Sequence, residues 1–418
     1  MKVRLYSLAA IAAIALASQG VAQENDQSLE RALAELNSGL AAPDHHGTVK
    51  IDGDFRARNR WSDDGMDTNN RDLDTRARLN FWFNVTDTSR AFVGFSGREA
   101  FGGSVSGRHD LGDLPSEAGG EGLDRAYVEV DSLVNDGGTV TIGRKYYTLG
   151  SGRLLGSEDW DNLVTTFSGI WYAHPLMGFN LHAAMLNGVE NGLSESDDMI
   201  YILGADWACD MVEACGPIHL APWIMRDETA SGGSAATHET WYGIDVNGGC
   251  MGIAYDFDFT RYEFGDFEGS AWYAGAGFEL EQLESVPGIQ GGGINVAISD
   301  TDDDFAVPGI NSVGAPYGLN YHDSVGFADV LGTSGIWTTD TDTWKVGVGI
   351  SPAEGWQGGV SLMNIDTAGA EFDEIDISLG THLGGNASTW FGYAWIDPNA
   401  GDDNMAVFWA TFDLAFGG

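Results

Sequence analysis

The sequence predicts an all-β protein, an antiparallel up-and-down transmembrane β-barrel of about 18 strands with a short periplasmic helix before it. Three observations support this fold class. From residue 48 onward, apolar and polar residues alternate with a period of two, which is typical of strands with two different faces. The connections alternate between tight turns and long Gly- and Asp-rich loops, as in outer-membrane barrels. Outside the N-terminal signal, no run of 18 consecutive apolar residues predicts a transmembrane helix.

The first 22 residues have the pattern of a secretory signal peptide. Lys2 and Arg4 precede an unbroken apolar run over residues 8–17, and small residues at 20–22 offer a cleavage site. Residues 23–47 then predict a periplasmic helix and linker, because leucines recur at helical spacing over residues 28–40 and Pro43 follows. The predicted organisation is a signal peptide (1–22), a helix and linker (23–47) and a barrel domain (48–418).

The alternation is clearest at the start of the barrel domain. Residues 49–61 place Val, Ile and Phe on one face and Lys, Asp and Arg on the other, and residues 73–85 repeat the arrangement. Predicted strands begin near residues 48, 72, 90, 122, 138, 162, 179, 198, 217, 238, 250, 269, 292, 342, 356, 373, 388 and 404. The even count places both ends of the barrel wall on the periplasmic side.

A secreted, soluble β-rich protein that binds carbohydrate is the alternative, with the apolar faces packed against a second sheet. Trp and Tyr recur near the predicted strand ends, as at Trp61, Trp171 and Trp241. Such placement is typical of aromatic girdles at a membrane interface and favours the barrel.

The composition excludes two other classes. There are 20 Lys and Arg residues against 62 Asp and Glu residues, giving a net charge of −42, so nucleic acid is not an expected partner. A hydrophobic content of 43% is too high for a disordered acidic chain.

Most basic residues of the predicted barrel precede residue 154, and acidic residues dominate after it. Cations of the first five strands predict a basic lumen wall that guides solutes, since Arg binds carboxylates bidentately and basic rings favour anions in a pore. The candidates are Arg56, Arg58, Arg60, Arg76, Arg78, Arg98, Arg125, Arg144, Lys145 and Arg153, with the phase of Arg144 uncertain beside Gly143. An opposing acidic wall is predicted from Asp206, Asp256, Asp258, Glu279, Glu374 and Asp376. The structural alternative is that Asp52, Asp54, Asp72 and Asp74 neutralise the arginines.

Other candidate sites are weaker. Cys209 and Cys215 bracket a short turn and form a possible disulfide, while all three cysteines (with Cys250) as free thiols is an equal alternative. His109/Asp110 and His322/Asp323 lack the context of a nucleophile, so no enzyme activity is expected. No cofactor or metal site is predicted, although acids at 63–69 and 300–304 leave weak surface Ca²⁺ binding open.

Several segments resemble the alginate-export family of outer-membrane porins. The resemblance rests on residues 143–153 (GRKYYTLGSGR) followed by Asp159-Trp160-Asp161, the Arg-x-Arg pairs at 56/58 and 76/78, residues 123–128 (LDRAYV) and residues 322–329 (HDSVGFAD). It is good over residues 48–175 and patchy beyond. It implies an 18-stranded barrel whose Arg-lined lumen passes an anionic or sugar-like solute.

Together these observations predict a bacterial outer-membrane porin, a water-filled channel for passive diffusion of small anionic or sugar-like solutes. The expected partners are membrane lipid, the solutes and the barrel-insertion machinery, with a homo-oligomer possible. The long loop 301–341 is the best candidate for a segment folded into the pore.

Overall fold

The computed structural model describes residues 48–63, 69–101, 121–157, 164, 166–190, 195–196, 199–209, 215–228, 238–280, 289–305, 340–351, 355–398 and 404–417. The predicted signal peptide, the predicted periplasmic helix with its linker, and most of the loop 301–341 lie outside the described residues. Within the described ranges, no helix is long and apolar enough to cross a membrane.

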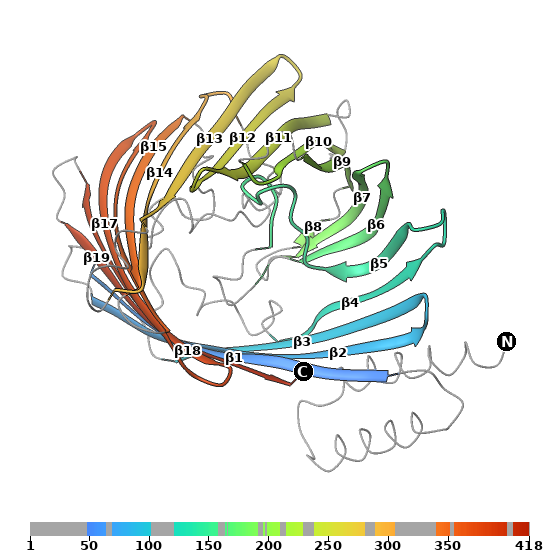
Figure 1. The fold of residues 1–418 in the computed structure, drawn as a ribbon, viewed down its shortest axis with the longest axis horizontal. Coiled ribbons are helices and arrows are strands. Elements are labelled where there is room, and N and C mark those ends of the chain that lie inside the picture. The colour runs from blue at the N-terminus through green and yellow to red at the C-terminus, as the bar shows by residue number, and fades with distance from the viewer. Residues whose placement is uncertain are drawn as a thin grey trace, which may run out of the picture.

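The strands form one closed antiparallel sheet (Figure 1). Each long strand pairs with the next along the chain, β7 pairs directly with β9, and β1 pairs with β19 to close the ring. The two-residue strand β8 pairs with the end of β7. Eighteen long strands therefore make the barrel, which confirms the predicted fold class. The first half consists of β1 (Thr48–Asp63), β2 (Asn69–Thr86), β3 (Ser89–Phe101), β4 (Glu121–Asp131), β5 (Thr139–Lys145), β6 (Thr166–Leu176), β7 (Phe179–Glu190), β8 (Glu195–Ser196) and β9 (Met199–Cys209). The second half consists of β10 (Ile218–Glu228), β11 (His238–Cys250), β12 (Ile253–Phe264), β13 (Phe267–Glu279), β14 (Gly291–Thr301), β15 (Thr341–Ser351), β16 (Trp356–Thr367), β17 (Ala370–Gly384), β18 (Ala387–Pro398) and β19 (Met405–Gly417).

The alternation along each strand separates an outer face from a lumen face. Large apolar side chains of the outer phase are exposed, for example Ile51 and Phe55 on β1 and Val346 and Val348 on β15. Residues paired across neighbouring strands share a face of the sheet. The face that carries Arg56 on β1 therefore also carries Arg76 on β2 and Asp413 on β19. Hydrocarbon covers the outer phase in a membrane barrel, so the other phase lines the lumen.

Two-residue turns connect β6 to β7 and β11 to β12 at one end of the barrel. Met177 and Gly178 have φ values of 52° and 88°, and Met251 and Gly252 have 54° and 79°. Two successive positive φ values define the type I′ turn, whose twist matches that of the flanking strands. Both chain ends of the barrel wall lie at this end, and the two longest connections, 102–120 and 302–340, join strands at the other end, so this is the periplasmic end.

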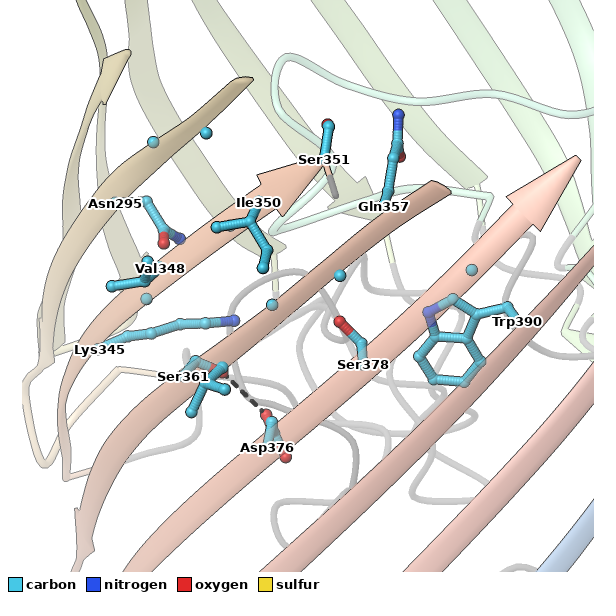
Figure 2. Close-up of a pocket in the computed structure, with 18 residues that line it drawn as sticks. Asn295, Lys345, Val348, Ile350, Ser351, Gln357, Ser361, Asp376, Ser378 and Trp390 are labelled. Carbon is cyan, nitrogen blue, oxygen red and sulfur yellow. Dashed lines mark hydrogen bonds between the residues drawn. The ribbon is translucent and has the colours of Figure 1, made fainter. Parts of the chain in front are cut away.

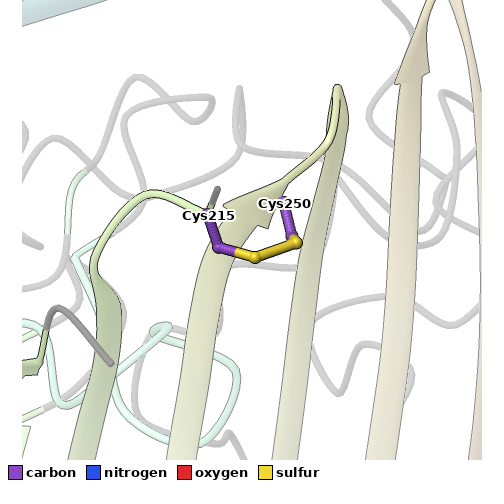
Figure 3. Close-up of a disulfide and its surroundings, with 2 residues drawn as sticks. All are labelled: Cys215 and Cys250. Carbon is purple, nitrogen blue, oxygen red and sulfur yellow. A yellow bond between two sulfur atoms is a disulfide. The ribbon is translucent and has the colours of Figure 1, made fainter. Parts of the chain in front are cut away.

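The disulfide joins Cys215 to Cys250 (Figure 3), and Cys209 is a free thiol. The predicted pair of Cys209 with Cys215 is therefore wrong. The register gives the reason: Cys209 lies opposite Ile218, whereas Cys215 forms a bridge pair with Cys250 at the periplasmic ends of β10 and β11. Neighbours in the folded ladder, rather than neighbours in the sequence, determine which thiols meet.

Candidate functional site: the lumen

The cations of the first strands gather on one side of the lumen. Arg56, Arg58 and Arg60 share the lumen phase of β1, and Arg76 and Arg78 lie beside them on β2. We call the following set the basic wall: Arg56, Arg58, Arg60, Arg76, Arg78, Arg125 and Lys145. Arg98 lies opposite Arg76 in the register of β3, and its side chain is outside the described part of the chain.

Carboxylates of the same wall pair with these arginines. Asp54 accepts from Arg78 at 2.7 Å and from Arg76 at 3.2 Å. Asp413 accepts from Arg56 at 2.7 Å, and Asp74 lies 3.6 Å from Arg58. Part of the structural alternative is thus present, with Asp54 and Asp74 as partners of the arginines.

The cations of the basic wall differ in how far they are exposed to the lumen. Asp54, Asp74, Asp124 and Asp413 are carboxylate partners among the described side chains. Arg58 and Arg76 are nearly inaccessible, with side chains 5% and 2% exposed. Arg56 and Arg78 are 16% and 13% exposed, so these two guanidinium groups are better placed to meet a solute.

Aromatic rings hold several cations in place. The guanidinium carbons of Arg58 and Arg60 lie 4.8 Å and 5.0 Å from the ring centre of Trp409. The Lys145 amine lies 4.7 Å from the ring of Trp171. Such cation–π contacts contribute about 0.5–2 kcal/mol each and restrict where the charge can move.

Arg125 has the most crowded surroundings of the basic wall. Its guanidinium lies 3.9 Å from the ring centre of Tyr146 and donates to Asp124 and Asn80. Tyr146, beyond the end of β5, donates its hydroxyl proton to Asp124 at 2.9 Å. Burial raises the pKa of Tyr146 to about 12, and the Asp124 charge adds to the effect, so the hydroxyl stays protonated.

Two predicted members of the basic wall lie elsewhere. Arg144 pairs with Ala126 and donates to Ser168 on the outer phase, because the lumen phase of β5 carries Gly143 and Lys145. Arg153 crosses the lumen and pairs with Asp256 and Asp258 on β12. The prediction that both line the basic wall is therefore wrong.

Residues 146–157, which we call the inner loop, fold into the barrel after β5 (Figure 1). Leu149, Leu154 and Leu155 are 3%, 2% and 0% exposed. They pack on apolar lumen-facing side chains of β6–β13, including Trp171, Ile202, Trp223, Met225 and Trp241. The inner loop thus occupies part of the lumen cross-section.

Polar contacts fix the same loop on the far wall. Arg153 donates to Asp256 at 2.8 Å and to Asp258, and its guanidinium carbon lies 3.5 Å from the ring centre of Tyr273. Gly150, with φ of +55°, lies against the Asp245 carboxylate, and a Cβ atom there would collide with it. Glycine is thus required at 150 both for its backbone angle and for space.

The remaining acids of the predicted opposing wall lie on the lumen phase in two groups. Glu279 on β13 lies across the barrel from β1–β5, whereas Asp206 on β9 is separated from β5 only by β6 and β7 and lies 3.4 Å from His182. Glu374 and Asp376 lie on β17, separated from β1 only by β18 and β19. Asp206, Glu374 and Asp376 therefore flank the basic wall, so their predicted position opposite to it is wrong.

The apolar inner surface was missed by sequence reasoning. Strands β7 and β9 have apolar residues on both phases, as in Ile200, Tyr201, Ile202 and Leu203. Loss of the alternation was the signal that a lumen face here is covered by protein rather than by water. It did not indicate which segment covers it.

The described residues hold no group of three or more His, Cys, Asp or Glu side chains placed for a metal ion. The acids at 300–304 take part in other contacts, since Asp300 accepts from Trp272 and Asp302 from Ser270. His109/Asp110, His322/Asp323 and residues 64–68 lie outside the described residues.

Comparison with known proteins agrees with this architecture. The family model described as "Alginate export" matches residues 48–339. The OpdO porin (OccK3) of Pseudomonas aeruginosa is similar with a TM-score of 0.57 and 15% identity, covering 88% of this chain and 96% of that one. A BenF-like porin from Pseudomonas fluorescens Pf-5 has a TM-score of 0.62 and 11% identity, covering 89% of this chain and 99% of that one. Pseudomonas aeruginosa OpdK, solved with vanillate, has a TM-score of 0.58 and 15% identity, covering 88% of this chain and 99% of that one. No curated protein matches the chain.

Proposed function

Because the chain belongs to the alginate export family and is an outer-membrane barrel with the porin fold, we propose that it passes small anionic or sugar-like solutes by diffusion. In this proposal the basic wall attracts and orients the solute, and the inner loop narrows the route. The observation that carries it is the cluster of guanidinium groups on the lumen phase of β1 and β2, of which Arg56 and Arg78 are partly exposed.

A small solute fits the charge distribution better than a long polyanion. Exposed carboxylates lie both beside the basic wall, at Asp206 with a side chain 57% exposed, and across the lumen from it, at Glu279. A polyanion that extends across the lumen would meet these carboxylates, whereas a small anion can stay near the basic wall. OpdK, a protein of the same fold, was solved with vanillate, an organic anion, which supports the small-solute proposal.

Ion selectivity tests the proposal. The variant Arg56→Gln/Arg78→Gln removes two partly exposed guanidinium groups, so the reversal potential in a KCl gradient should shift toward cation preference. The measurement is made in planar bilayers at low ionic strength, where charges in the pore are least screened.

A matched control changes the carboxylate partners. The variant Asp54→Asn/Asp413→Asn leaves all the guanidinium groups and should shift the reversal potential the opposite way. Equal reversal potentials in the wild type and both variants would show that the basic wall does not determine which ions pass.

A further inference from the structure

A second feature of the lumen lies apart from the basic wall, on β14–β18 (Figure 2). It is a trough of about 440 Å³ near the periplasmic half of these strands. Lumen-facing glycines at 293 on β14, 347 and 349 on β15 and 359 on β16 form its floor, because these three neighbouring strands lack side chains there. We call it the glycine trough.

Trp390 borders the glycine trough on the β18 side, where Figure 2 shows its ring. Its indole lies over Gly392, since a Cβ atom there would be 2.8 Å from ring carbon Cζ2. A Cβ atom on Gly380, the cross-strand partner, would be 3.2 Å from Cδ1. The two glycines allow the ring to lie down along the wall, and this arrangement turns one aromatic face toward the lumen.

Polar groups surround the rest of the glycine trough. Ser361 donates to Asp376 at 3.3 Å, and Ser378 and Gln357 lie on the same wall. On the other side, Asn295 lies against Gly347, and the Lys345 side chain extends along the wall toward Ser361 (Figure 2). One ammonium and one carboxylate make this set close to neutral, in contrast to the basic wall.

We propose that the glycine trough binds one ring of a neutral sugar. The apolar C–H face of the ring would stack on Trp390, and its hydroxyls would exchange hydrogen bonds with Ser378, Asn295 and Gln357. The volume falls within the range of about 300–1,000 Å³ typical of small-molecule sites, and a few polar groups around an apolar surface are the usual composition. The proposal rests on the proposed function, since it names a solute class that the same lumen accommodates.

The probe is glucose, titrated against the detergent-solubilised barrel and followed by saturation-transfer NMR. Wild type should transfer saturation mainly to the C–H protons of one sugar face. Trp390→Ala should weaken glucose binding by about tenfold, because it removes the stacking surface, and Trp390→Phe should restore most of it.

A second variant pair tests the trough without touching Trp390. Gly349→Leu should abolish glucose binding, because Gly349 is exposed on the floor and a Cβ atom there meets only the Gly358 carbonyl oxygen, at 3.9 Å. Gly291→Leu is the matched control outside the trough, with nothing within 4 Å of its Cβ position, and should bind glucose as wild type does.

Undetectable glucose binding by wild type, or equal binding by Gly349→Leu and Gly291→Leu, would overturn the proposal. Tighter binding of benzoate than of glucose, lost in Trp390→Ala, would overturn it in favour of an aromatic acid. KCl conductance is recorded on the same samples. An open channel that does not bind glucose refutes only the sugar site, and glucose binding without conductance refutes only the channel.

Discussion

The inner loop should be held in the lumen mainly by its leucines. Leu149, Leu154 and Leu155 are 3% exposed or less, and burial of each stabilises by about 1.5–3 kcal/mol, or about 4.5–9 kcal/mol together. Removing one partner of a buried ion pair costs about 3–5 kcal/mol, which is the expected loss for Arg153→Met. The apolar contribution exceeds the ionic one, so the loss of Arg153 alone should leave the inner loop docked.

The perturbation that should release the loop is Leu154→Ser/Leu155→Ser. Truncation of a buried leucine costs about 2–5 kcal/mol, so the pair loses about 4–10 kcal/mol, comparable to the whole apolar contribution. The barrel wall itself should persist, because its strands are joined by a continuous ladder that closes between β1 and β19.

Single-channel conductance in about 1 M KCl measures the effect, since a Debye length of about 3 Å suppresses the influence of pore charges there. Leu154→Ser/Leu155→Ser should conduct more than wild type, and Arg153→Met should conduct as wild type does. The control is Leu133→Ser/Val134→Ser, which changes two residues that are 60% and 64% exposed in a periplasmic turn.

Wild-type conductance in a folded Leu154→Ser/Leu155→Ser barrel would refute the reasoning, because the inner loop would then not limit the current. A large increase in the conductance of Arg153→Met would show that the ion pairs of Arg153 hold the inner loop more strongly than its leucines do. Folding is checked on gels, where a folded barrel changes its mobility on boiling.

Three further predictions concern stability. Cys215→Ser should lower the free energy of urea unfolding by about 4 kcal/mol, because the disulfide closes a loop with a sequence separation of 35 and so restricts the unfolded chain. The conductance should not change. Equal unfolding midpoints with and without the bridge would contradict this. Arg76→Met should lower the unfolding free energy by about 3–5 kcal/mol because Arg76 is a buried partner of Asp54, and a wild-type midpoint in urea would count against it. Gly252→Val should lower the unfolding free energy by about 1–2 kcal/mol through backbone strain alone, because φ is +79° and a Cβ atom there meets nothing within 4 Å. The same urea titration tests this prediction, and an unchanged midpoint would argue against backbone strain.

The sequence by itself determined the strands and their faces. The period-two pattern is local, because successive side chains of a strand alternate between lipid and lumen wherever the strand lies. All eighteen long strands begin within four residues of their predicted starts, as β1 does at Thr48 and β16 at Trp356. The same alternation places Arg56, Arg58 and Asp258 on the lumen phase.

Only the tertiary structure decided which lumen groups meet. Arg153 lies about a hundred residues before Asp256 in the chain, and the two meet because three leucines of the inner loop dock on β6–β13. The Cys215–Cys250 bridge likewise follows from the register of β10 and β11. Contacts across a lumen depend on which loop folds inward and on the strand order around the ring, and no local pattern of residues contains that information.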